Sequence, residues 1–238
     1  MPKTNTIDLL GDDVVARAII NDTITDYTDD EINKIAKNAF KSCSQLTSAD
    51  LPEVLSIEDY AFNGCYALTS INLPKVRSIG AQAFYDCSQL TSIDLPEVTS
   101  IGGSAFSGCL LLASINIPKI TTINSYTLQK CYQLTSIDLP EVTRIVSSAF
   151  YSCKHLVSIN LPKVTSIDAN VFNGCYELTS VIIRTTTAVC TLSNANALSS
   201  ASSAIIYVPD DKVDDYKAAT NWSTYASRIK GLSELPVS

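Results

Sequence analysis

A repeat of 22 residues runs through most of this chain of 238 residues. Cysteines recur at this spacing without a slip, and prolines do the same. The cysteines are at positions 43, 65, 87, 109, 131, 153 and 175, and the prolines are at 52, 74, 96, 118, 140 and 162. A fixed period of roughly 20–50 residues indicates a solenoid in which successive coils stack on one another. We therefore expect residues 24–177 to form seven stacked coils.

The residues of one coil predict how it folds. In LTSINLP, Leu68, Ile71 and Leu73 alternate with polar residues, which is the pattern of a short strand with one buried face. Pro74 ends the strand because proline has no N–H to donate to a sheet. A second extended segment (KVRSI) and a tight helical or 3₁₀ turn (AFYDC) lead to the next coil. The prediction is an α/β solenoid, a right-handed leucine-rich-repeat stack with one parallel sheet whose strands lie at residues 48–51, 70–73, 92–95, 114–117, 136–139 and 158–161.

The two ends of the chain depart from the repeat and predict caps on a single domain spanning 1–238. A solenoid leaves an apolar cross-section bare at each end unless something covers it. Apolar residues within 6–21 have helical spacing, and Asp210 or Asp211 is suited to begin a helix that precedes Trp222. The expected division is an N-terminal helical cap (1–23), seven repeats (24–177), a degenerate repeat ending in a strand (178–208) and a C-terminal helical cap (209–238).

A second period of 44 residues is superimposed on the first. One column reads Asp50, Asn72, Asp94, Asn116, Asp138 and Asn160, and another reads Glu53, Lys75, Glu97, Lys119, Glu141 and Lys163. Like charges one coil apart would repel, whereas opposite charges on neighbouring strands stabilise the pair by roughly 0.2–1 kcal/mol. We interpret both columns as ladders that stabilise the stack and its register. The alternative is that they recognise a ligand.

The cysteine and phenylalanine columns predict a regular core. Seven of the eight cysteines hold one structural position, and Cys190 is the eighth. Such a column is typical of buried, reduced thiols, and the alternative is disulfides between neighbouring coils. No CxxC pair occurs, so the common zinc and redox patterns are absent. In the phenylalanine column, Phe106 is expected to be buried between Phe84 and Leu128, the latter replacing a Phe.

Nothing in the sequence predicts catalysis, a metal ion or a cofactor. His155 is the only histidine and is expected to be an exposed residue at the coil edge. The serines at 48, 70, 92, 114, 136, 158 and 180 lack a base that would make one of them a nucleophile. The glycines do not form a phosphate-binding loop, and the acidic clusters do not match a calcium-binding loop. We therefore expect a protein that is not an enzyme.

Charge and hydropathy exclude some partners. The net charge of −7 argues against binding to a nucleic-acid backbone. The sequence contains no apolar run of about 18 residues, so it predicts no membrane span. The first residues, MPKTNTIDLLGDDVV, do not have the apolar core of a signal peptide. The export route and the oligomeric state are left open.

The units AF-x-x-C-x-x-LTSI-x-LP-x-VTSIG resemble the BspA-like leucine-rich repeats of bacterial surface proteins over 24–177. The closing segment, IIYVPDDKVDDYKAATNWSTYASRIKGLSEL, resembles the C-terminal piece of such arrays in gut bacteria. This resemblance implies a non-catalytic module at the cell surface that serves adhesion or recognises a protein or glycan. The opening segment, IINDTITDYTDDEI, also resembles proteins of gut phage particles. The alternatives are therefore a structural or receptor-binding component of a phage particle, or a cytoplasmic location.

Two rows of side chains are candidates for ligand binding. Leu110 and Leu111 replace polar residues on the turn edge, and aromatic anchors contribute much of the energy of protein interfaces. The favoured row is this turn edge, with Tyr85, Leu110, Leu111, Tyr132 and Tyr151. The competing row is the sheet face, a small polar strip suited to a glycan, with Ser92, Asp94, Ser114, Asn116, Ser136 and Asp138.

Overall fold

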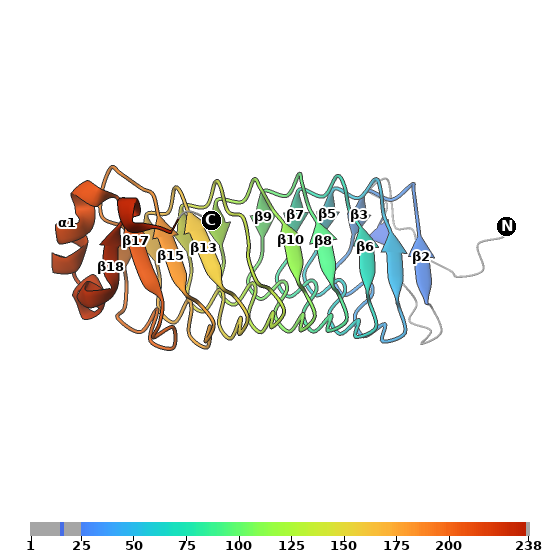
Figure 1. Ribbon diagram of the computed structural model, residues 1–238. Coiled ribbons are helices and arrows are strands. Elements are labelled where there is room, and N and C mark those ends of the chain that lie inside the picture. Colours follow the sequence, from blue (N-terminus) through green and yellow to red (C-terminus); the bar gives the residue numbers. More distant parts are fainter. Residues whose placement is uncertain (1–14, 17–24, 237–238) are drawn as a thin grey trace.

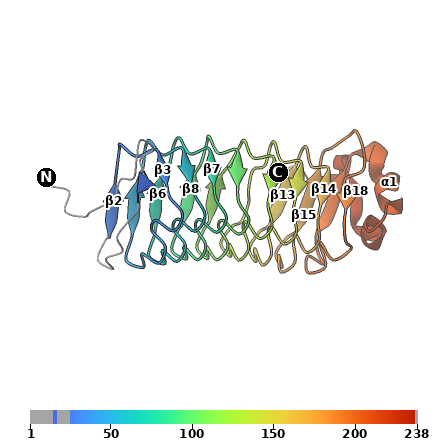
Figure 2. The same ribbon diagram turned by 180° about the vertical axis from the view of Figure 1, so that it is seen from behind.

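The computed structural model describes residues 15–16 and 25–236 and shows a rod of stacked coils (Figures 1 and 2). Each paired strand runs parallel to the equivalent strand of the neighbouring coil. In the regular part the register advances by one repeat, so that Ser70 pairs with Ser48 and Ile79 pairs with Ile57. The predicted parallel solenoid is therefore confirmed.

Each coil contributes strands to two faces of the rod rather than to a single sheet. The strands of the first face are β2 (Asp26–Thr28), β4 (Ser48–Asp50), β6 (Ser70–Asn72), β8 (Ser92–Asp94), β10 (Ser114–Asn116), β13 (Ser158–Leu161), β15 (Ser180–Ile183), β17 (Ile205–Val208) and β18 (Ile229–Gly231). The strands of the second face are β1 (Val15–Ala16), β3 (Lys34–Ile35), β5 (Ser56–Ile57), β7 (Ser78–Ile79), β9 (Ser100–Ile101), β11 (Thr122–Ile123), β12 (Arg144–Ile145), β14 (Ser166–Ile167) and β16 (Thr191–Leu192).

The first face is not the continuous sheet that the repeat predicts. Its ladder consists of β2-β4-β6, then β10-β8, then β13-β15-β17-β18. The strand expected at 136–139 does not form, and only Asp138 bridges to Asn160 there. Most of the other expected strands end one residue earlier than predicted, since the residue before the proline is outside the ladder.

The turns that return from the second face to the first are not helical, contrary to the expectation for AFYDC. Each of these turns from residue 38 to residue 174 contains two residues with left-handed backbone, such as Gln82 (φ 55°) and Asp86 (φ 58°). This conformation interrupts a helix and turns backbone N–H groups toward the next coil. The Phe84 N–H donates to the Ala105 carbonyl (2.8 Å), and the Asp86 N–H donates to the Ser107 carbonyl (2.8 Å). These bonds form a third ladder along the rod, which we call the turn ladder.

Aromatic rings stack along the centre of the rod. Phe40, Phe62, Phe84 and Phe106 lie in one column with ring centroids 4.9–5.2 Å apart and nearly parallel planes. Phe106 is fully buried, as expected, and the next coil has the equally buried Leu128 in its place. The column resumes with Phe150 and Phe172.

The cysteine column adds hydrogen bonds that its apolar character alone does not predict. Each of six thiols donates to the backbone carbonyl of the residue at the aromatic position of the preceding coil, for example Cys65 to Phe40 (3.1 Å) and Cys131 to Phe106 (3.4 Å). All eight cysteines are buried. Burial raises the pKa of the Cys175 thiol to about 12 and that of Cys190 to about 12.

We expect the thiols to be unreactive in the folded protein, because the reactive thiolate is suppressed by these raised pKa values. At pH 8 a thiol-specific reagent should modify less than about one thiol per folded chain, and all eight should react after denaturation without a reductant. Fewer than eight after denaturation would mean that some cysteines are joined in disulfides.

The structure describes most of the predicted C-terminal cap but only two residues of the predicted N-terminal cap. The N-terminal helix expected over 6–21 lies outside the described residues except at β1, and there the backbone is a strand paired with β3. After β17 the chain forms short helices, and β18 then returns to the first face. These helices are η1 (Asp210–Lys212), α1 (Val213–Ala218), η2 (Trp222–Arg228) and η3 (Leu232–Glu234).

Side chains of this C-terminal segment bond to the outer edge of β16 and to Cys190, the residue directly before it. The Tyr216 hydroxyl accepts a hydrogen bond from the Cys190 N–H (2.9 Å), and the Trp222 indole donates to the Cys190 carbonyl (2.6 Å). The Asn221 amide donates to the Leu192 carbonyl (2.8 Å). Trp222 is fully buried. The segment therefore occupies one end of the rod, where Figure 1 shows α1 beyond the last coils.

Candidate binding surfaces

Polar side chains cover the first face in internally bonded pairs. The Asn72 amide donates to Asp50 (2.8 Å), and the Asn116 amide donates to Asp94 (2.7 Å). At the adjacent turn three lysines bond to the glutamate of the preceding coil, each at 2.6 Å: Lys75 to Glu53, Lys119 to Glu97 and Lys163 to Glu141. The hydrogen bond that Lys119 donates, together with its charge, lowers the pKa of Glu97.

The period of 44 residues thus corresponds to bonds between the two coils of each pair. The geometry agrees with the interpretation as ladders, since each lysine reaches the glutamate one coil before it. Exposed pairs of this kind stabilise a protein by only about 0–1 kcal/mol each. Their larger effect is on register, because a slip by one coil would place like charges beside each other.

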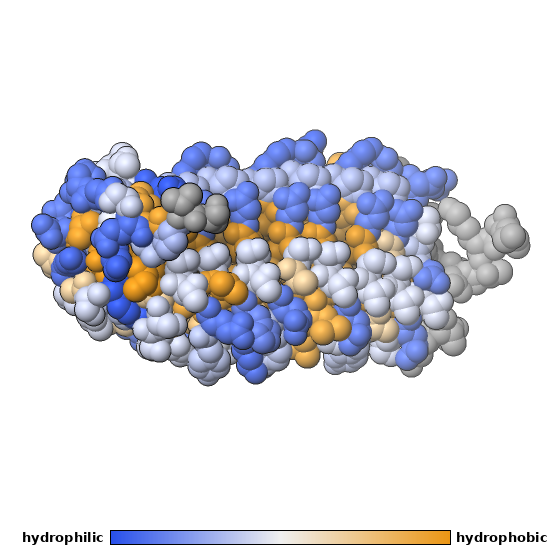
Figure 3. Space-filling view, in the orientation of Figure 1, coloured by the Kyte–Doolittle hydropathy of each residue, from blue (hydrophilic) through white to orange (hydrophobic). Residues whose placement is uncertain are grey.

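The turn edge presents exposed apolar side chains near the middle of the rod. Leu110 and Leu111 are 36% and 38% exposed. Leu110 lies in the same column as Tyr132, one coil before it. Val157 (42% exposed) lies about two coils further along the rod, directly before β13. Figure 3 shows hydrophobic surface at the lower edge of the rod below β10 and β13, between hydrophilic side chains.

The structure does not bring all five predicted turn-edge residues together. Tyr85 and Tyr151 are partly buried and belong to one column, but three coils separate them. Between them that column holds Ser107 and Gln129, which bond to each other (3.0 Å). Leu110, Leu111 and Tyr132 therefore form a local cluster, and the two outer tyrosines lie apart from it.

Residues that the sequence did not single out modify this cluster. The Lys154 ammonium lies 4.2 Å from the centre of the Tyr132 ring, so one face of that ring is covered. The most exposed tyrosines are instead Tyr176 (65%) and Tyr66 (53%), which share the column of Leu110. His155 is at the coil edge as expected and lies 2.9 Å from Glu177.

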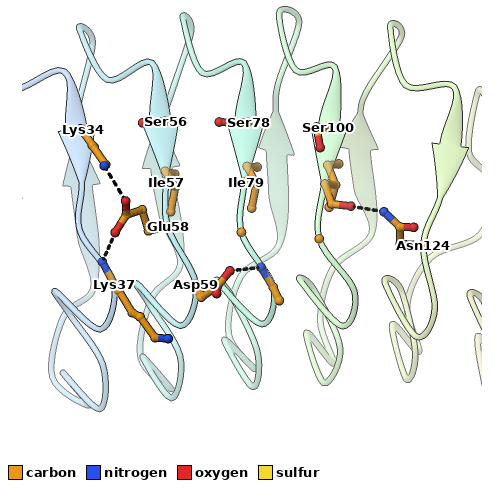
Figure 4. A pocket seen from close by; sticks show the side chains of 14 residues that line it. Lys34, Lys37, Ser56, Ile57, Glu58, Asp59, Ser78, Ile79, Ser100 and Asn124 are labelled. Carbon is orange, nitrogen blue, oxygen red and sulfur yellow. Dashed lines mark hydrogen bonds and ion pairs between the residues drawn. The ribbon is translucent and has the colours of Figure 1, made fainter.

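A groove of about 710 Å³ on the second face was not predicted. It crosses β3, β5, β7 and β9, as Figure 4 shows. At one end Glu58 bonds to the Lys34 ammonium (2.5 Å) and to the Lys37 N–H (2.9 Å). At the other end Asn124 donates to the Ile101 carbonyl (2.7 Å).

Glycines make this groove shallow and smooth in the middle. A Cβ on Gly80 would lie 2.4 Å from the Asp59 nitrogen, and one on Gly102 would lie 2.4 Å from the Ala81 nitrogen. The glycines are thus explained by the close approach of neighbouring coils. The Asp59 carboxylate accepts from the Ala81 N–H (2.8 Å), so this carboxylate is bonded within the protein.

The described part of the chain contains no cluster of His, Cys, Asp or Glu that would hold a metal ion. Likewise, no helix in the described ranges has the length and hydropathy needed to cross a membrane.

Comparison with known proteins identifies the repeat. The model of the BspA type leucine rich repeat region matches six copies, over residues 21–135 and 121–210. The chain belongs to this family. A leucine rich repeat protein of T. pallidum is similar to this BspA-type chain in structure, with 22% identity, coverage of 97% of this chain and 96% of that one, and a TM-score of 0.54. This likeness supports the fold.

Two further solved structures resemble the BspA-type chain more distantly. A leucine rich cell surface protein of Faecalibacterium prausnitzii has 18% identity, a TM-score of 0.41 and coverage of 87% of this chain and 86% of that one. A leucine-rich repeat protein of Bacteroides ovatus has 20% identity, a TM-score of 0.40 and coverage of 82% of this chain and 71% of that one. A search of curated proteins finds no match.

The BspA-type repeat positions account for the core of this protein and leave its surface undetermined. The Leu, Ile, Val, Phe and Cys residues that recur in each unit are almost all buried. Any specificity must therefore come from the positions that vary between coils, such as 110 and 111.

Proposed function

We propose that this BspA-type array is a non-catalytic binding module that takes a protein ligand on the turn edge around Leu110 and Leu111. The observation that carries the proposal is the exposure of two adjacent leucines, at 36% and 38%. Their columns otherwise hold mainly Ser, Tyr, Lys and Gln. Exposed apolar groups beside an aromatic ring are typical of protein interfaces, where a few such residues contribute most of the binding energy.

The biological role we infer is adhesion or protein recognition at a bacterial cell surface. Membership of the BspA-type family supports this inference, and the similar protein of F. prausnitzii is described as a cell surface protein. The alternative role is that of a structural or receptor-binding component of a phage particle. The turn edge would be the binding site in either role. The proposed site therefore does not depend on whether the protein acts at a cell surface or in a phage particle.

The polar strip on the first face is the competing site, and its ligand would be a glycan. Its side chains are exposed and follow one another at the spacing of the coils. One of its two carboxylates, Asp94, already accepts a bond from Asn116, which reduces its capacity for a ligand. For this reason we favour the turn edge.

Screening the protein against matrix proteins and glycans, followed by paired variants, tests the site. We expect Leu110→Ser combined with Tyr132→Ser to weaken binding of a protein ligand by about 30-fold or more, since truncating central apolar anchors has that effect. Asp94→Ala combined with Asp138→Ala should change the affinity less than about threefold.

The matched control is Leu55→Ser, which removes another exposed leucine (40% exposed) from a different part of the surface. It should leave binding unchanged. Loss of binding only in the aspartate pair would assign the site to the first face. No effect of either pair on a bound ligand would show that both rows are scaffold.

We also propose that residues 209–236 act as the C-terminal cap of the single domain. The hydrogen bonds from Trp222 and Asn221 to the edge of β16 support this role. An unpaired strand edge would otherwise be open to pairing with another chain.

A further inference from the structure

The connections between coils are interrupted in the middle of the rod. In the described chain the second face has one gap in its ladder, between β9 and β11. The first face has its longest gap, between β10 and β13, directly after that point. The aromatic column is interrupted at Leu128, in the turn between these two gaps. Three separate features of the stack therefore change around the coil of residues 112–133.

The gap in the second face has a visible cause. In most coils a backbone N–H at this position donates to the preceding coil, for example Gly102 to the Ile79 carbonyl (2.8 Å). At the gap the Asn124 side chain donates to the Ile101 carbonyl (2.7 Å) instead, as Figure 4 shows. The side-chain amide thus occupies the acceptor that a backbone N–H would use, and β9 and β11 remain unpaired.

The gap in the first face lies one coil further along the rod than the gap in the second face. Residues 136–139 form no strand, and only Asp138 pairs with the next coil. In the core, Leu128 replaces the ring that would join Phe106 to Phe150, so the stacked aromatic contact of the other coils is missing. Stacked aromatic pairs stabilise a core beyond their buried area, and a leucine does not provide this contribution.

The turn ladder, in contrast, is continuous through the same coils. The Phe106 N–H donates to the Thr127 carbonyl (2.9 Å), and the Leu128 N–H donates to the Ala149 carbonyl (2.9 Å). The earlier gap between β6 and β8 differs in the core, because there Phe84 stacks on Phe106.

We propose that residues 112–139 are a flexible joint between two stiffer blocks, at which the rod bends about its turn edge. At each step the turn ladder and one sheet hold the coils together (β8 with β10, then β11 with β12), while the unpaired strands of the other sheet permit the coils to separate on that side. In a solenoid each coil contacts only its neighbours, so one weak step divides the array into two cooperative units. Bending here changes the relative direction of the two halves of the rod. This inference does not depend on the ligand.

Hydrogen exchange of the full chain, measured by mass spectrometry, tests the joint. We expect backbone amides within 112–139 to exchange at least about tenfold faster than those of β4, β6, β13 and β15, because local opening is easiest where few connections must break. Equal protection of 112–139 and the flanking strands would overturn the proposal.

A pair of variants supplies the second test. Leu128→Phe combined with Asn124→Gly gives the central coil the residues of the preceding coil, Phe106 and Gly102, and should slow exchange within 112–139 by about tenfold. Phe62→Leu is the matched control, because it introduces the same leucine where both faces are paired. It should leave exchange within 112–139 unchanged. A folded double variant with unaltered exchange would contradict the joint, and if the double variant does not fold, the exchange pattern of the natural chain decides.

Discussion

Replacing Phe106 with alanine is expected to lower the free energy of unfolding by about 3–5 kcal/mol, the usual range for a buried Phe. Phe106 has no exposed surface and stacks on Phe84 with ring centroids 5.2 Å apart and planes within 2°. Its other neighbour in the column is Leu128, which cannot extend into the space left by the ring. Because each coil is stabilised by its neighbours, the loss should spread into the coil of Phe84.

Chemical denaturation monitored by circular dichroism measures this effect. Gln133→Ala is the control, since Gln133 is exposed and belongs to the following coil. A change in unfolding free energy no larger than that of the control would show that Phe106 does not have the core position assigned to it. Hydrogen exchange of the Phe106→Ala variant would show how far the damage spreads.

The regular part of this fold was predictable because stacking requires equal coils. A parallel ladder pairs residue with equivalent residue, so a constant period of 22 residues already specifies which residues are neighbours. The inward positions of Leu, Ile, Val, Phe and Cys follow from the same argument, and these columns are buried apart from the partly buried Ile71.

The interruptions were not predictable from the pattern of a single coil. The sequence LTSIDLP occurs at 90–96 and again at 134–140, yet the first copy contains β8 and the second contains no strand. Pairing is a property of two adjacent coils, and the second copy follows the coil of Asn124 and Leu128, where the ladders are interrupted. The motif of a single coil does not contain this information.

The sequence predicted which residues of the candidate site share a column, but it did not predict how exposed each side chain is. The spacing correctly indicated that Leu110 and Tyr132 are neighbours. It did not indicate that Lys154 covers the Tyr132 ring or that Tyr85 and Tyr151 are partly buried. Exposure depends on the length and direction of the adjacent side chains, which the repeat pattern of the sequence does not specify.

Replacing Trp222 with alanine is expected to destabilise the C-terminal end of the rod by about 3–5 kcal/mol. Trp222 is fully buried, packs edge-to-face on Tyr216 with ring centroids 5.4 Å apart, and donates to the Cys190 carbonyl at 2.6 Å. Its loss removes both the packing and one of the bonds that cover the edge of β16. The exposed strand edge should then pair with other chains, so the variant should associate as its concentration rises.

Unfolding curves and light scattering after size-exclusion chromatography measure the two effects together. Trp222→Phe is the informative comparison, because it keeps an aromatic ring against Tyr216 but cannot donate to Cys190. It should be destabilised by about 1–3 kcal/mol, the range for leaving a buried backbone acceptor without its partner. It should also remain at the molecular mass of the natural chain, since Asn221 still covers the Leu192 carbonyl. If Trp222→Ala kept both the stability and the molecular mass of the natural chain, the C-terminal segment would not be a cap, and the end of the stack would be stable without it.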